Sequence, residues 1–169
     1  MRNILIVGAG KSSPYLIKYL LDKSQEQNLY LNITDVTIDH LQHHKKNNRC
    51  TVSTINILDD KEREECLLKN DIIISMLPAR LHMILANSCL KLKKNLITAS
   101  YVSDEMRGIN TDVKDRNLIF LNEMGLDPGI DHMSAKKVID KLKENSCSIY
   151  SFKSCLLYTS TSPRDIGES

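Results

Sequence analysis

Short apolar runs alternate with amphipathic stretches along most of the chain, and this alternation limits the possible folds more than any other feature. The apolar runs lie at 4–7, 29–34, 51–57, 71–75, 95–99 and 117–121. Stretches with helical periodicity lie at 15–23, 38–46, 61–69, 79–92, 103–115 and 133–144. Continuously apolar strands that alternate with helices are typical of a parallel sheet covered on both faces. Right-handed crossovers then predict an α/β fold with a doubly wound, Rossmann-type parallel sheet.

Length and composition are those of one ordinary globular domain. The chain has 169 residues, of which 41% are hydrophobic, and its formal net charge is +2. That charge offers no electrostatic reason to expect nucleic acid or an anionic membrane as a partner. The five cysteines form no C-x-x-C pair, and the run 4–7 is too short for a signal-peptide core or a membrane span. We therefore expect a cytoplasmic protein with reduced cysteines.

A glycine-bearing turn directly follows the first expected strand and opens the first expected helix. Its sequence is Gly8-Ala9-Gly10-Lys11-Ser12-Ser13. In a dinucleotide-binding fold the first glycine permits a tight turn, the second lets the backbone approach the pyrophosphate, and the third position must be small. Ser13 takes that third position, and the start of the helix favours phosphate. The spacing excludes a Walker-type P-loop, and the alternative is that the glycines only form a turn.

Asp35 follows the second expected strand, where a dinucleotide-binding fold contacts the adenosine ribose. A carboxylate there can accept a hydrogen bond from a ribose hydroxyl and would repel a 2′-phosphate. No arginine occurs among residues 36–45. We therefore expect NAD as the cofactor and regard NADP as the less favoured alternative.

Polar or tightly turned segments follow the other expected strands as well. Because ligands of open parallel sheets bind outside the carboxyl ends of the strands, each segment is a candidate for the site. Asp59 follows the third strand, and we expect it near the adenine. The segment Ser75-Met76-Leu77-Pro78 ends the fourth strand, and we expect it beside the ribose and pyrophosphate. The fifth strand is followed by Ser100-Tyr101-Val102-Ser103.

The segment 122–132 contains two glycines and a proline within five residues. They impose a sharp backbone path that brings Asp127, Asp131 and His132 around one turn. Asp131 is also a plausible N-cap of the helix that follows. We expect Asp127 at the rim of the site, facing the nicotinamide.

The segments Ser-Tyr-Val-Ser (100–103) and Asn-Glu-Met-Gly-Leu-Asp-Pro-Gly-Ile-Asp-His (122–132) resemble signature segments of the glutamate-forming saccharopine dehydrogenase family. The resemblance covers roughly residues 1–154. It implies NAD(P)-dependent oxidation of a secondary amine, saccharopine, to an imine that is hydrolysed to glutamate and 2-aminoadipate semialdehyde. It also implies that Ser100, Tyr101 and Asp127 contact the amino-acid substrate, with Asp127 and Tyr101 as the catalytic pair. Gly8, Gly10, Lys11, Ser12, Ser13, Asp35, Ser75, Leu77 and Val102 would line the cofactor site.

The resemblance also predicts a division of the chain. Residues 1–147 would form the cofactor-binding domain, 148–154 would begin a truncated substrate domain with a strand at 148–153, and 155–169 would be a non-native or disordered tail. We expect the chain to bind cofactor but to lack catalysis on its own, and the full-length protein to be a possible homodimer.

Three alternatives remain open on the sequence. His40, His43 and His44 share one helix face, but no cysteine or carboxylate joins them at ligand spacing. We interpret them as a solvated face and expect no metal site. A non-catalytic, NAD-binding regulatory module would need no substrate domain. A related polyamine or imine oxidoreductase would share the fold and the cofactor.

Overall fold

The computed structural model describes residues 1–153, and the expected tail at 155–169 lies outside them. Six strands form one sheet in the order β3-β2-β1-β4-β5-β6, and all neighbouring strands are parallel. The strands are β1 (Arg2–Val7), β2 (Leu29–Asp35), β3 (Cys50–Thr54), β4 (Ile72–Ser75), β5 (Asn95–Thr98) and β6 (Phe120–Leu121). This is the strand order of a doubly wound dinucleotide-binding fold, so the predicted fold class is confirmed.

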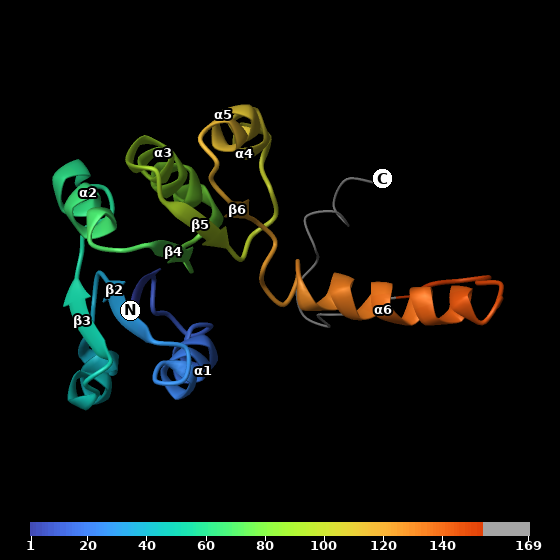
Figure 1. The fold of residues 1–169 in the computed structure, drawn as a ribbon, viewed down its shortest axis with the longest axis horizontal. Helices are drawn as coiled ribbons and strands as arrows, with labels where there is room; N and C mark the ends of the chain where they lie inside the picture. Colours follow the sequence, from blue (N-terminus) through green and yellow to red (C-terminus); the bar gives the residue numbers. More distant parts are fainter. Residues whose placement is uncertain (154–169) are drawn as a thin grey trace, which may run out of the picture.

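Helices cover both faces of the sheet (Figure 1). The helices are α1 (Pro14–Lys23), the 3-10 helix η1 (Asp39–Lys46), α2 (Asp60–Leu68), the 3-10 turn η2 (Ala79–Leu81), α3 (His82–Leu92), α4 (Asp104–Gly108), α5 (Asn110–Asp115) and α6 (Ile130–Glu144). Strand β1 explains why two layers form. Its Ile4 and Ile6 join a core on one face, and its Leu5 and Val7 join a core on the other. An uninterrupted apolar strand is therefore buried on both sides.

Several expected elements differ from the structure. The stretch 38–46 is a 3-10 helix rather than an α-helix, and the stretch 103–115 divides into α4 and α5. The sixth strand keeps only two of the residues 117–121. Residues 148–153 form no strand. A strand needs a neighbour for its backbone hydrogen bonds, and no described strand lies beside this segment.

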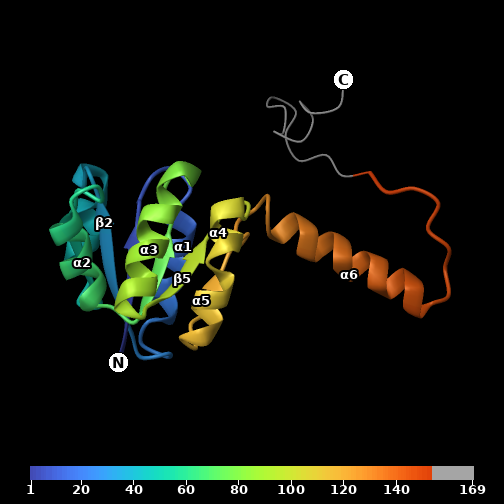
Figure 2. The ribbon, with the colours of Figure 1, turned by 90° about the horizontal axis from the view of Figure 1, so that it is seen from above.

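Helix α6 lies apart from the layered body in both views (Figure 1; Figure 2). Among the described residues, none of this helix is buried. Ile130, Met133 and Val138 are each more than half exposed. The helix has an apolar face that no described element covers. No helix in the described part of the chain is long and apolar enough to cross a membrane.

Candidate functional site

The site lies at the edge of the sheet where all six strands end. The first loop there turns at Gly8, whose φ is +91°. A Cβ on Gly8 would lie 3.0 Å from the backbone carbonyl carbon and oxygen of Met76. Glycine is therefore required both for the backbone conformation and for the close approach of the segment after β4. In contrast, a Cβ on Gly10 would meet no protein atom within 4 Å. The space over Gly10 is left open for a ligand.

The loop between β1 and α1 presents a run of backbone amides. The Ala9 amide donates to Asp35 Oδ2 at 2.6 Å, and the Ser13 amide donates to the Gly10 carbonyl at 3.0 Å. Between them, the amides of Gly10, Lys11 and Ser12 have no acceptor among the described residues. Consecutive amides at the start of a helix bind phosphate well. The residues present therefore fit the pyrophosphate of a dinucleotide.

Ser13 is buried, and its hydroxyl donates to the Gly10 carbonyl at 2.8 Å. The position had to be small, as the sequence pattern required, and serine fulfils this by bonding inside the loop. The Ser13 hydroxyl hydrogen is therefore used within the protein. Lys11 and Ser12 are exposed at the tip of the loop.

Asp35 holds the phosphate loop in place from the end of β2. Besides the Ala9 amide, its carboxylate accepts the Val36 amide at Oδ1, at 2.6 Å. His40 Nε2 lies 2.7 Å from the Ala9 carbonyl oxygen, and because that oxygen can only accept, the ring nitrogen donates. His40 is therefore more than part of the solvated face that we expected, since it ties η1 to the loop.

A cavity of about 510 Å³ opens beside these groups. Six of the expected cofactor residues line it: Gly8, Gly10, Asp35, Met76, Leu77 and Pro78. The sequence interpretation missed five apolar lining residues: Val7, Val36, Ile55, Ile57 and Leu81. Ile55 and Ile57 were assigned to a strand, but β3 ends before them, and both line the cavity. An apolar slot with a carboxylate at its rim suits an adenosine.

Three residues that we expected at the cofactor, Asp59, Ser75 and Val102, do not line this cavity. Asp59 is the N-cap of α2, and its Oδ1 accepts the Glu62 amide at 2.9 Å. Ser75 is fully buried beneath the site. Val102 lines a separate cavity of about 600 Å³, together with residues of α4, α5 and β6.

Tyr101 and Asp127 come together although 26 residues separate them. The Tyr101 hydroxyl donates to Asp127 Oδ1 at 2.6 Å. Glu123 supports the segment that carries Tyr101, because its amide donates to the Ser100 carbonyl and its carboxylate accepts the Val102 amide. Glu123 gave no signal in the sequence, since its role depends on the path of the chain after β6.

A tight loop presents Asp127. Its Asp127–Pro128 peptide bond is cis. The Gly125 amide donates to the Pro128 carbonyl, and the Ile130 amide donates to the Gly125 carbonyl. Gly129 has a φ of +147°, and a Cβ there would lie 2.1 Å from the Gly125 carbonyl oxygen. The two glycines allow this closure, as the sequence indicated.

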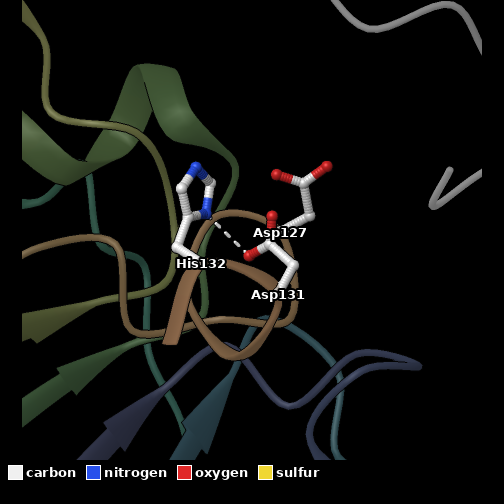
Figure 3. A group of neighbouring side chains, drawn as sticks. All are labelled: Asp127, Asp131 and His132. Atoms are coloured by element: carbon white, nitrogen blue, oxygen red, sulfur yellow. Dashed lines mark hydrogen bonds and ion pairs between the residues drawn. The ribbon is translucent and has the colours of Figure 1, made fainter. Parts of the chain in front are cut away.

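Asp131 is not the N-cap of α6. The N-cap is Gly129, and Asp131 lies inside the first turn, where its Oδ1 accepts the Gly129 amide at 2.9 Å. His132 Nδ1 lies 2.7 Å from the same oxygen (Figure 3). Desolvation raises the pKa of Asp131, but the hydrogen bonds from His132 and Gly129 outweigh it and leave the pKa below its usual value. Asp127, Asp131 and His132 each offer one side-chain oxygen or nitrogen that could bind a metal ion, and these atoms lie within 4.8 Å of one another. This group is separate from the three histidines at 40–44 that the sequence analysis considered for a metal.

Comparison with known proteins decides the family. The model of the saccharopine dehydrogenase NADP binding domain matches residues 4–121. The chain belongs to the saccharopine dehydrogenase family. The resemblance inferred from residues 100–103 and 122–132 is thereby confirmed, as is the expectation of an oxidoreductase family with a dinucleotide-binding fold.

Two relatives and one solved structure place this saccharopine dehydrogenase family member more closely. The mitochondrial alpha-aminoadipic semialdehyde synthase of Rattus norvegicus is 32% identical over 156 residues, which cover 90% of this chain and 16% of that protein. The NADP(+), L-glutamate-forming saccharopine dehydrogenase of Saccharomyces cerevisiae is 28% identical over 153 residues, which cover 90% of this chain and 34% of that protein. A solved apo structure of the Saccharomyces cerevisiae enzyme superposes with a TM-score of 0.75 at 27% identity, covering 86% of this chain and 32% of that one. The chain therefore spans about a sixth to a third of the length of these relatives.

Proposed function

We propose that this chain is the dinucleotide-binding part of an enzyme that oxidises the secondary amine of saccharopine. The observation that carries the proposal is one shared sheet edge. There, a glycine-bearing loop with three amides lacking described acceptors follows β1, and Tyr101 and Asp127 follow β5 and β6 of the same parallel sheet. A pyrophosphate site and a proton-transfer pair on one edge suit an oxidoreductase that also moves protons.

The proposed reaction divides between cofactor and protein. A bound nicotinamide would supply the acceptor for a hydride from the carbon that bears the amine. The amine must lose a proton before that step, and water must lose one as the imine is hydrolysed to glutamate and 2-aminoadipate semialdehyde. Asp127 is an exposed carboxylate already bonded to a phenol, so it can accept a proton while Tyr101 relays one. The Ser100 hydroxyl and the Tyr101 phenol would contact the amino-acid substrate.

Asp35 supports a preference for NAD within this proposal. Both of its carboxylate oxygens accept backbone amides, so its negative charge is held at the rim of the cavity. A 2′-phosphate placed there would meet a fixed like charge, whereas a ribose hydroxyl could donate to it. The name of the family model and that of the Saccharomyces cerevisiae relative both carry NADP. The cofactor preference is therefore a property to be measured on this chain.

A fluorescence titration of the chain with NADH and with NADPH tests the cofactor assignment. We expect NADH to bind more tightly by about tenfold, and Asp35→Asn to bring the two affinities together. The variant also disturbs the loop through the Ala9 amide, but that effect is common to both ligands and cancels in their ratio. Tighter binding of NADPH by the parent chain would contradict the proposed preference. Binding of neither nucleotide would reject the dinucleotide site.

Turnover needs a second test, because the chain spans only part of its relatives. Residues 1–147 would replace the matching segment of the Saccharomyces cerevisiae enzyme, and cofactor reduction with saccharopine would be followed by absorbance. Asp127→Asn and Tyr101→Phe should lower kcat by about 100-fold while cofactor affinity changes little. Full activity in both variants would contradict the catalytic roles of Tyr101 and Asp127. Cofactor binding without turnover by the chimera would favour the non-catalytic regulatory module. Activity with a polyamine but not with saccharopine would favour the related amine oxidoreductase.

Two further expectations stay predictions. The cytoplasmic location is one of them, and the name of the Rattus norvegicus relative describes that protein as mitochondrial. Homodimer formation by the full-length protein is the other.

A further inference from the structure

A buried histidine connects the segment after β4 to the segment after β5. His82 is 5% exposed at the start of α3. Its Nδ1 lies 2.8 Å from Ser75 Oγ, and its Nε2 lies 2.8 Å from Ser100 Oγ. Ser75 ends the strand beside the dinucleotide cavity, and Ser100 precedes Tyr101 of the proposed catalytic pair. One imidazole ring therefore joins the two halves of the site.

The positions of the hydrogens on Ser75, His82 and Ser100 follow from burial and from the acceptors within reach. A neutral imidazole donates from one nitrogen and accepts at the other. The Ser75 hydroxyl is fully buried, and His82 is its only side-chain hydrogen-bond partner among the described residues. A buried hydroxyl without an acceptor is costly, so the Ser75 hydrogen points to Nδ1. Nε2 must then carry the ring proton and donate it to Ser100 Oγ.

The opposite tautomer leaves a polar group unsatisfied. If Nδ1 carried the proton, it would donate to Ser75 Oγ, and the Ser75 hydrogen would have no described acceptor. The Ser100 hydroxyl would then donate its hydrogen to Nε2. Burial also lowers the pKa of His82, which keeps the ring neutral near pH 7 and preserves the distinction between its two nitrogens.

We propose that His82 is a positioning residue that makes Ser100 a hydrogen-bond donor to a carboxylate of the substrate. Ser100 Oγ accepts the Nε2 proton, so its only hydrogen is directed away from His82. Ser100 is only half-buried, so that hydrogen can reach a ligand. An acceptor-only group such as a carboxylate satisfies it best. This inference rests on the proposed function for the identity of the ligand, but the direction of the hydrogen bonds does not depend on it.

The tautomer can be measured on the chain itself. Long-range proton–nitrogen NMR correlations of the histidine rings, at about pH 7.5, distinguish a protonated ring nitrogen from an unprotonated one. We expect His82 to be protonated at Nε2 and unprotonated at Nδ1. In Ser75→Ala, which removes the hydroxyl that selects the tautomer, this preference should weaken. Protonation at Nδ1 in the parent chain would overturn the proposal.

Two matched variants test the effect on the ligand. A glutamine side-chain amide can replace the Nε2 donor, whereas an asparagine amide reaches only the position of Nδ1. L-Glutamate is the probe, titrated into the NADH-saturated chain while the amide signals of Ser100 and Tyr101 are followed. His82→Asn should weaken glutamate binding by about tenfold or more, and His82→Gln should stay within about threefold of the parent.

The outcomes separate this proposal from the proposed function. An equal loss of glutamate affinity in both variants would mean that His82 has only a structural role. Unchanged affinity in both variants would show that His82 does not affect ligand binding. Absence of any glutamate effect in the parent chain would overturn the carboxylate assignment. Failure of both NADH and NADPH to bind would reject the oxidoreductase proposal, while the tautomer measurement would still decide the direction of the hydrogen bonds.

Discussion

Arg63 is a buried cation whose removal should destabilise the chain strongly. It lies on α2 with 6% of its surface exposed. Its Nε donates to Ser88 Oγ at 2.8 Å, its Nη1 donates to the Ile57 carbonyl at 2.8 Å, and its Nη2 contacts Asp60 Oδ1 at 2.5 Å. The guanidinium therefore ties α2 to α3 and to the wall of the cavity of about 510 Å³, which Ile57 lines.

The magnitude follows from what Arg63→Met leaves behind. Methionine keeps most of the buried volume, so the loss of stability comes mainly from the missing hydrogen bonds of the guanidinium. The Ile57 carbonyl and the Ser88 hydroxyl each lose a charge-assisted partner in the interior, at about 1–1.5 kcal/mol apiece. Asp60 is 85% exposed, so its ion pair adds less than about 1 kcal/mol. We expect the free energy of unfolding to fall by about 3 kcal/mol, which is roughly 6–12 °C in Tm for a chain of this size.

Urea titration followed by circular dichroism measures the change, with Asp60→Asn as the matched control. The control removes only the exposed partner and should cost less than about 1 kcal/mol. The reasoning fails if Arg63→Met is as stable as the parent, or if Asp60→Asn costs as much as Arg63→Met. Because Ile57 lines the cavity, Arg63→Met should also weaken NADH binding in the titration described above.

Three further predictions concern the loop, the thiols and pH. Gly129→Ala should disrupt the loop that presents Asp127 and lower the Tm measured by thermal denaturation. In the control Gly108→Ala, no atom lies within 4 Å of the new Cβ, so the Tm should stay unchanged. Cys89 is buried with its pKa raised to about 12 by desolvation, so alkylation monitored by mass spectrometry should modify exposed Cys147 before Cys89. Burial lowers the pKa of His82 from 6.5, so neutral His82 stabilises the fold above that pH. Urea titrations should show stability declining below about pH 6.5, less steeply in His82→Gln.

Much of the site could be predicted because it depends on local patterns. The apolar strand at 4–7 and the turn Gly8–Ser13 specify a strand, a tight bend and a helix start within ten residues. The parallel sheet then brings the strand ends to one edge whatever the details of packing. For the same reason Tyr101 and Asp127 could be expected together. Family resemblance through residues 122–132 added the proton-transfer roles, which the local pattern alone did not contain.

The remaining features depend on which groups burial leaves without water, and only the tertiary structure decides that. Asp59 looked like a ligand at a strand end, yet its carboxylate accepts the Glu62 amide as the N-cap of α2. Arg63 lies in a charged run and His82 in an apolar one, and neither sequence context reveals the partners, Ser88 and Ser100, that lie 25 and 18 residues away. The segment 148–153 has the composition of a strand, but a strand exists only beside another strand. Periodicity thus determines the layers, while hydrogen-bond partners across them determine the site.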